Sequence, residues 1–354
     1  AYIYERDANT WVFKQKITEP VRSTNNRFGF SVAVDQDTIV IGSPSTNGNG
    51  SAYVYQYSET GFELTGTLTP TLHTNIASSV YSFGNSVSIT NDMIIVGSPG
   101  NSFDNSETNT LSSSGAAWVY VLDSKTLTWN QVQKLAEDGD VRNPGDMLGF
   151  SMEYSNGTLA VGAPWHSYED IGRNYQLNAG AVFVWSWDDV TNTWTYDQKI
   201  TPKVRSSGNF FGSKIAIDQN TMVVLCSDNT NTTVGYSTIN GRLIEFTKVN
   251  GKWIEGQSIT PTIGSYSTKS TIQRYSNMTY SNTEISLYGD ILVFSITDFY
   301  TDGGGPNSGI VNIMRKTNSW SVEKILCPGL TAFTFYGFSL SAGKDIVVIG
   351  NPYF

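Results

Sequence analysis

Histidine, cysteine and long apolar runs are scarce or missing in this chain of 354 residues. The two histidines, His73 and His166, lie on different predicted loops and cannot form a three-histidine zinc site. The two cysteines, Cys226 and Cys327, end strands in different predicted repeats, which favours two small buried thiols over a disulfide. No apolar run reaches the length of a membrane-spanning helix, so we expect a soluble chain without membrane insertion.

Basic charge is also in short supply. Lysine and arginine number 22 against 31 acidic residues, so the net charge is −9, and we expect no nucleic-acid partner. Charged residues make up 15% and aromatic residues 13%, a balance typical of globular proteins. Nucleophile-elbow and phosphate-loop motifs are absent, which argues against two large enzyme classes. The many carboxylates leave a paired-carboxylate glycosidase open.

What the sequence does contain is a repeat. Residues 28–44 read FGFSVAVDQDTIVIGSP, a pattern that predicts two short strands joined by a tight turn. In the clear copies an aromatic residue or leucine opens the stretch 14 residues before a glycine. A fixed internal period predicts a repeat architecture. The further copies occupy residues 83–99, 148–164, 211–227, 281–297 and 336–352, and the fourth and fifth of the six copies are degraded.

A second hairpin follows each of the first five copies, and residues 1–20 form such a hairpin without a preceding copy. The chain ends after the sixth copy, so the half that is missing at one end is present at the other. The pattern therefore predicts an all-β fold, a single domain over residues 1–354. We expect a six-bladed β-propeller of four-stranded antiparallel blades, one of which is closed by N- and C-terminal strands. The first strands start near residues 28, 83, 148, 211, 281 and 336.

The Phe-Gly opening and the Gly-Ser/Ala-Pro ending of these copies resemble the FG-GAP repeat. That repeat builds the propeller of integrin α subunits and many bacterial and protist surface proteins. The resemblance implies adhesion or extracellular assembly, and constrains function only weakly. Integrin-type copies often carry a calcium loop between the first two strands, whereas the turns here, such as residues 35–37, are too short to wrap a calcium ion. We expect no metal and no cofactor.

Long, variable connections on one face of the predicted propeller are the expected binding region. Exposed aromatic side chains there could stack on sugars or anchor a protein, or could instead fold back over the blades. The candidate contact residues are Trp165, His166, Tyr168, Tyr175, Tyr266, Tyr275, Phe299 and Tyr300.

Two further sets of residues are candidates for surface chemistry. A Val-Arg pair recurs in three predicted loops, and Arg22, Arg142 and Arg205 could bind an anion together or each pair with a local carboxylate. Four sequons lie in predicted turns or loops, which favours an extracellular chain with N-glycans. Their acceptors are Asn49, Asn156, Asn231 and Asn277.

These observations lead to two expectations from different functional classes. The first is a non-enzymatic extracellular or cell-surface subunit for adhesion or structure, part of a fibre or coat. Its partners would be other extracellular proteins, glycans or further copies of itself. The alternative is a glycan-binding lectin or glycan-acting hydrolase that uses the long-loop face. A polar, concave centre with convergent carboxylates would separate the second class from the first.

Overall fold

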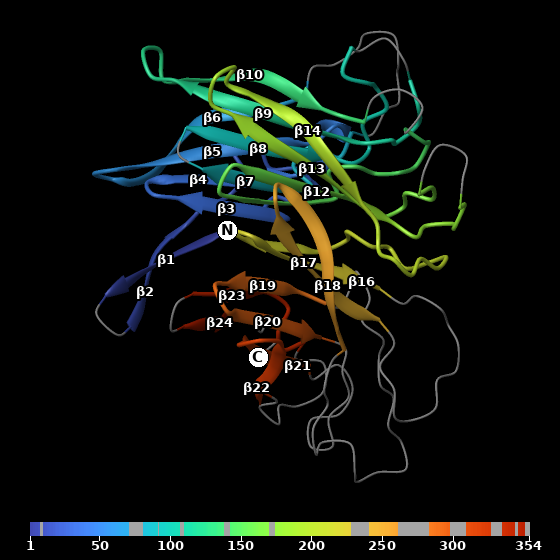
Figure 1. Ribbon diagram of the computed structural model, residues 1–354. Helices are drawn as coiled ribbons and strands as arrows, with labels where there is room; N and C mark the ends of the chain where they lie inside the picture. The colour runs from blue at the N-terminus through green and yellow to red at the C-terminus, as the bar shows by residue number, and fades with distance from the viewer. Residues whose placement is uncertain are drawn as a thin grey trace. The chain divides into compact units, whose positions relative to one another are not determined.

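The structure is a computed structural model, and strands make up almost all of its regular structure (Figure 1). Among the described residues, no helix is long and apolar enough to cross a membrane. The prediction of an all-β fold is confirmed. The described residues are 1–7, 10–70, 81–90, 92–106, 110–137, 142–169, 174–227, 241–260, 283–297, 309–326, 335–343 and 346–350.

Five antiparallel four-stranded sheets follow one another along the chain, each with its strands in sequence order. One short 3-10 turn, Thr46–Gly48, lies in the first of them. The sheets comprise β3 (Ser31–Asp35), β4 (Thr38–Ser43), β5 (Ser51–Ser58) and β6 (Gly61–Leu68); β7 (Ser86–Thr90), β8 (Met93–Ser98), β9 (Ala116–Asp123) and β10 (Thr128–Leu135); β11 (Ser151–Ser155), β12 (Thr158–Ala163), β13 (Ala181–Asp188) and β14 (Thr193–Ile200); β15 (Ile215–Asp218), β16 (Thr221–Cys226), β17 (Arg242–Val249) and β18 (Lys252–Ile259); β19 (Ile285–Tyr288), β20 (Ile291–Ile296), β21 (Ile310–Lys316) and β22 (Trp320–Leu326).

Two two-stranded sheets lie at the ends of the chain: β1 (Tyr2–Asp7) with β2 (Thr10–Lys16), and β23 (Leu340–Ala342) with β24 (Val347–Ile349). The repeated four-stranded units are typical of propeller blades. Because the described strands form seven separate sheets, the closure of six blades stays a prediction.

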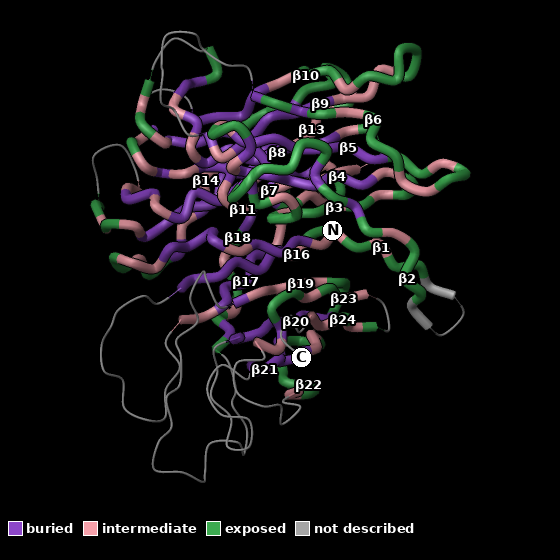
Figure 2. The backbone as a smooth tube through the Cα atoms, turned by 180° about the vertical axis from the view of Figure 1, so that it is seen from behind, coloured by how far each residue is buried: buried purple, intermediate pink, exposed green. Residues whose placement is uncertain are grey.

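The strand pattern explains where the core lies. The second strand of each four-stranded sheet is a run of consecutive apolar residues, as expected for a strand covered on both faces. Figure 2 shows β4, β8 and β16 almost entirely buried, whereas β1 and β2 are largely exposed. Cys226 ends β16 and is buried, as predicted, whereas Cys327 lies outside the described residues.

The described chain divides into two compact units, residues 1–152 with 187–195, and residues 153–186 with 196–354. In the first unit, apolar side chains of successive sheets form one cluster around Val40, Val54, Phe83 and Trp118. In the second unit, a corresponding cluster surrounds Phe246. Each core therefore forms between sheets, because a single sheet has no second layer of its own.

In the first unit, the repeated serine and glycine positions make the same contact between successive sheets. Ser31 Oγ donates a 2.8 Å hydrogen bond to the Gly84 carbonyl oxygen, and Ser86 Oγ does the same to Gly149. A Cβ atom at Gly42 would lie 2.1 Å from the Gly84 oxygen, so only glycine fits this approach. The repeated serine and glycines are thus explained by packing between sheets.

A glutamine on the outer strand makes a second repeated contact. The side-chain amide of Gln133 donates to the Trp194 carbonyl and accepts from the Trp194 N–H, both at 2.8 Å. The same two-bond contact recurs along the chain, with one glutamine holding the backbone of the aromatic residue that starts the next outer strand. The other pairs are Gln15 with Phe62, Gln198 with Trp253, and Gln257 with Trp320.

The two degraded copies compensate for the residues they lack. Lys214 occupies the position of Ser31 in the fourth copy and pairs with the Glu284 carboxylate of the fifth. Ser295 occupies the position of Gly42, and its Oγ donates a 2.7 Å hydrogen bond to Gly337. The contact between sheets is therefore kept, with the hydroxyl moved from the first strand to the second.

Candidate functional site

The connection between β12 and β13 carries four of the predicted contact residues, and its described part is well ordered by hydrogen bonds. The Gln176 N–H donates to the Ser167 carbonyl at 2.8 Å, and the Asn178 N–H donates to Ser167 Oγ at 3.0 Å. The Gly180 N–H donates to the His166 carbonyl at 2.8 Å. These bonds tie the two limbs of the loop together.

A second loop, residues 201–211 before β15, supports the first. The Gly208 N–H donates to the Leu177 carbonyl at 2.8 Å, and the Phe210 N–H donates to Asn178 at 2.9 Å. The Trp165 ring packs edge-on against Phe210, with centroids 5.5 Å apart. Because these hydrogen bonds and the ring contact join the two loops, the side chains at the loop tips are presented on a fixed backbone.

An aromatic pair lies at the tip of this arrangement. The rings of Tyr168 and Tyr175 meet edge-on with centroids 5.1 Å apart, and Tyr175 is 54% exposed. The Asn174 side chain donates to the Glu169 carboxylate. The Arg205 Nη1 donates a 2.7 Å hydrogen bond to the Asn174 carbonyl, which brings the guanidinium into the same group. We call Tyr168, Glu169, Asn174, Tyr175 and Arg205 the Tyr175 platform.

The charges of the platform are opposite in sign. Burial lowers the pKa of the Arg205 guanidinium from its ordinary value, and the nearby Glu169 carboxylate acts in the opposite direction. Arginine stays protonated at neutral pH despite such a shift. The platform therefore combines tyrosine rings, one fixed positive charge and one carboxylate.

Other predicted contact residues are placed differently. His166 has no exposed surface, and its ring packs edge-on against Phe183 at 5.6 Å, so its prediction as a surface contact is corrected. Trp165 is half-buried and supports the loop through Phe210. The remaining four, Tyr266, Tyr275, Phe299 and Tyr300, lie outside the described residues.

The three predicted anion-binding arginines have three different environments. Arg22 is exposed, whereas Arg142 is buried and donates to Ser114 Oγ at 2.8 Å and to the Ser102 carbonyl at 3.1 Å. The prediction of Arg142 as a surface anion ligand is therefore corrected, because its guanidinium holds a neighbouring loop. Of the three, Arg205 is the one that bonds to the loop carrying Tyr168 and Tyr175, through the Asn174 carbonyl.

Two of the four sequon asparagines are described. Asn156 is exposed in the two-residue turn between β11 and β12, where its φ of 46° suits the Asn-Gly turn sequence. Asn49 is half-buried, and its carbonyl accepts the Phe83 N–H at 2.9 Å. Asn231 and Asn277 lie outside the described residues. Asn156 is the more accessible of the described acceptors.

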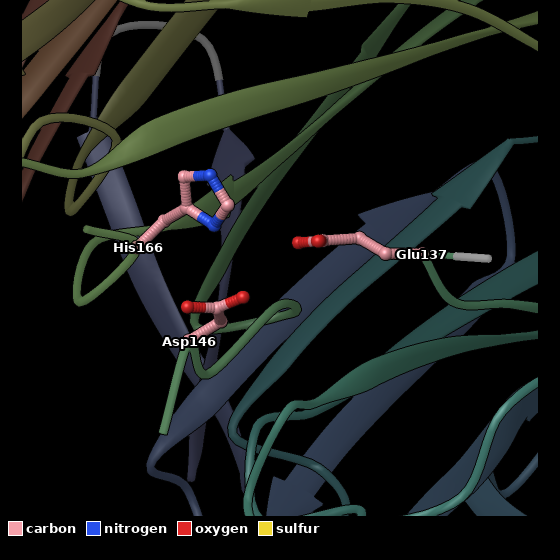
Figure 3. A group of neighbouring side chains, drawn as sticks. All are labelled: Glu137, Asp146 and His166. Carbon is pink, nitrogen blue, oxygen red and sulfur yellow. The ribbon is translucent and has the colours of Figure 1, made fainter. Parts of the chain in front are cut away.

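The sequence did not single out two buried carboxylates, Glu137 and Asp146, which lie in the connection between β10 and β11 (Figure 3). The Asn143 N–H donates to the Asp146 carboxylate at 2.8 Å. Carboxylates are among the side chains that bind metal ions in proteins. In the sequence, the only sign of these two residues is their position within the repeat.

The repeat contains a parallel in the first unit. Glu19 lies two residues after the core residue Ile17, which follows β2, as Glu137 lies two residues after Leu135 of β10, and the Glu19 carboxylate is buried. Although burial raises the pKa of Glu19, the hydrogen bonds to its carboxylate together hold that pKa below its ordinary value. The position thus holds a carboxylate through protein hydrogen bonds alone. The donors are Asn26, Ser43, Thr46 and Tyr53.

Comparisons with known proteins identify the repeat and structures similar to this chain. A family model described as the FG-GAP repeat matches residues 11–55, so the predicted repeat is confirmed there. A crystal structure of a protein from Lactobacillus plantarum superposes with a TM-score of 0.53 at 12% identity, covering 94% of this chain and 78% of that one. Sqt1 from Saccharomyces cerevisiae superposes with a TM-score of 0.47 at 11% identity, covering 93% and 81%. No curated protein matches the sequence.

Proposed function

We propose that this protein is a non-enzymatic extracellular or cell-surface subunit that acts by contact, through the Tyr175 platform. The carrying observation is the Tyr168–Tyr175 pair, with Tyr175 exposed, on a backbone held by hydrogen bonds from two loops. Exposed aromatic residues on a fixed backbone supply contact area at low entropic cost. The FG-GAP repeat favours an extracellular location, with other proteins or glycans as partners.

The scaffold we propose for this surface is a closed six-bladed propeller, whose sixth blade combines β23–β24 with β1–β2. Each hairpin packs against a four-stranded sheet of its own unit, as a half-blade would. Ile3 and Ile17 join the cluster of Ile39 and Ile41. Val347 and Ile349 join the cluster of Val293 and Val311.

Exposed apolar residues mark the faces that closure would cover. Val348, in the middle of β24, is 50% exposed, whereas the corresponding residues of the five complete sheets are 0–1% exposed. Tyr2 on β1 is 61% exposed, whereas its counterparts are 5% exposed or less. Val32 and Val34 on β3 are exposed too, although their counterparts Val87 and Ile89 pack against the preceding sheet.

The complete sheets also predict the register of the missing pairing. On β4 and β5, Val40 lies opposite Val54 and Ile41 lies opposite Tyr53. Transferred to the half-blades, this register places Val348 opposite Ile3 and Ile349 opposite Tyr2. Closure in this register would bury the exposed residues named above, each with a gain of roughly 1.5–3 kcal/mol for a large apolar side chain.

The location is tested on the cells that make the protein. A membrane-impermeant amine-reactive label should modify the protein on intact cells, and peptide mapping of the native material should find a glycan on Asn156 or another sequon asparagine. Labelling only after lysis, with bare asparagines, would contradict the extracellular assignment.

The contact function is tested by competition. Soluble protein should inhibit attachment of the same cells to each other or to their substratum, and Tyr175→Ala should weaken this inhibition without changing the melting temperature. Tyr57→Ala is a matched control, because Tyr57 is 57% exposed and pairs edge-on with Phe62. Equal inhibition by the wild type and Tyr175→Ala would refute the platform as the contact surface.

A further inference from the structure

One edge of the Arg205 guanidinium has no hydrogen-bond acceptor in the part of the chain that the structure describes. Nη1 donates to the Asn174 carbonyl at 2.7 Å, whereas Nε and Nη2 have no partner among the described residues. These two atoms form the side of the guanidinium that donates two parallel hydrogen bonds to one carboxylate. A buried donor without an acceptor is unfavourable, so an acceptor at this edge would stabilise the guanidinium.

We propose that the Tyr175 platform binds a saccharide that carries a carboxylate, with the carboxylate on Nε and Nη2 of Arg205 and the sugar ring against Tyr175. This inference rests on the proposed contact function and specifies its ligand. It combines two candidate sets that the sequence analysis treated separately: the aromatic residues of one loop and the arginine of the next loop.

The surroundings of Arg205 favour a sugar over an apolar protein surface. The platform is made of a guanidinium, a carboxylate, an amide and two phenol rings, and Gln176 and Ser207 lie beside it, joined by a 3.1 Å hydrogen bond. Cores of protein interfaces are enriched in tyrosine and arginine but depleted of glutamate, so Glu169 is the member of the platform that disfavours an apolar protein partner. A sugar ring offers an apolar C–H face to an aromatic ring and hydroxyl groups to amides and carboxylates. Tyr175 and Asn174, both exposed, match these two faces.

The charge of Glu169 should limit the affinity of the site for a carboxylate. Its carboxylate accepts the Asn174 side-chain N–H and lies close enough to Arg205 to affect the guanidinium electrostatically. Nε and Nη2 are shielded from solvent, so binding of a ligand at this edge requires a local rearrangement that exposes them. The Glu169 charge repels an incoming carboxylate, and Glu169→Gln should therefore increase the affinity for an acidic saccharide.

The test is an array of immobilised oligosaccharides that contain uronic or sialic acids, beside the same oligosaccharides with their carboxylates converted to methyl esters. We expect the protein to bind acidic members and to lose at least tenfold in affinity on the esters. Arg205→Lys should lose about 10- to 100-fold, because it cannot donate two parallel hydrogen bonds. Tyr175→Ala should lose at least fivefold. Arg27→Lys and Tyr57→Ala, at exposed positions outside the platform, should bind like the wild type.

Binding to no acidic member, equal binding to the esters, or wild-type binding by Arg205→Lys would overturn the proposal. These results leave the contact function measurable by itself. If Tyr175→Ala reduces inhibition of cell attachment while Arg205→Lys and the methyl esters change nothing, the contact function stands and the acidic saccharide is excluded. If Tyr175→Ala changes neither assay, both proposals fail.

Discussion

Replacing Val348 with lysine distinguishes a closed sixth blade from two separate hairpins. Val348 is 50% exposed in the structure, and a substitution at such a site alters the free energy of unfolding by about 0.5 kcal/mol or less. In a closed blade it would occupy the position of Val293, which is fully buried. An unpaired charge at such a position costs about 3–5 kcal/mol. Since whole domains are stable by about 5–15 kcal/mol, the difference is readily measured.

The assay is urea unfolding followed by tryptophan fluorescence, with two lysine variants as references. Val190→Lys changes a residue that is 90% exposed and should leave the midpoint unchanged. Val293→Lys introduces the charge at the corresponding position of a complete sheet and sets the scale of a buried site. If Val348→Lys prevents folding, Val348→Ala gives the milder measure, about 1.5–2 kcal/mol for two buried methyl groups and their cavity.

We expect Val348→Lys to resemble Val293→Lys. If its midpoint instead matches that of Val190→Lys, Val348 is exposed in solution and the reasoning from corresponding positions is refuted.

Three further predictions concern the contacts described above. Gln133→Ala should lower the free energy of unfolding by about 1–3 kcal/mol, because two hydrogen bonds to Trp194 are lost. Asn130→Ala, at an exposed position on the same strand, should leave this free energy unchanged. Equal urea midpoints for the two variants would refute the role of the Gln133 amide. The pKa of Glu19 is held below its ordinary value, so the ionised carboxylate stabilises the fold above that ordinary pKa, and this stabilisation is lost as pH falls through the folded-state pKa. Melting temperatures measured from pH 6 to 3 should therefore decline more steeply for the wild type than for Glu19→Gln. Parallel curves for the two proteins would contradict this. A chelator should leave the melting temperature unchanged, because turns such as residues 36–37 are too short to bind calcium. A large fall in melting temperature would reveal a bound metal. In that case Glu137 and Asp146 are the first residues to mutate.

The spacing of apolar residues and glycines was sufficient to predict the hairpins. β3 and β4 lie within the predicted stretch 28–44, and the same agreement holds for β19 and β20 in a copy that had lost its Phe-Gly opening. Periodicity of two and tight turns are local properties, so the sequence carries them directly. The compensation in that copy was not predictable, because Lys214 and Glu284 are far apart in sequence and meet only through packing between sheets.

The candidate site was predicted in part. The exposure of Tyr175 was expected, whereas His166 is buried although it adjoins Trp165 in sequence. Side-chain direction in an irregular loop depends on tertiary contacts, here the ring of Phe183, which no local pattern reports. Arg142 and Arg205 follow the same Val-Arg motif, yet Arg142 is buried and bonds to Ser114, whereas Arg205 bonds to the carbonyl of the exposed Asn174. The motif therefore could not distinguish a buried structural arginine from one at a surface loop.

Disulfide trapping of the sixth blade tests the central claim most directly. In the register of β4 and β5, cysteines at positions 3 and 348 would face each other across neighbouring strands, with Cβ atoms about 4.5–5.5 Å apart. We predict that Ile3→Cys/Val348→Cys forms an intramolecular disulfide under mild oxidation, seen as a peptide link between the two ends in a monomer and absent from each single variant. Monomeric protein with both thiols free, or a disulfide found only between chains, would contradict a blade closed within one molecule.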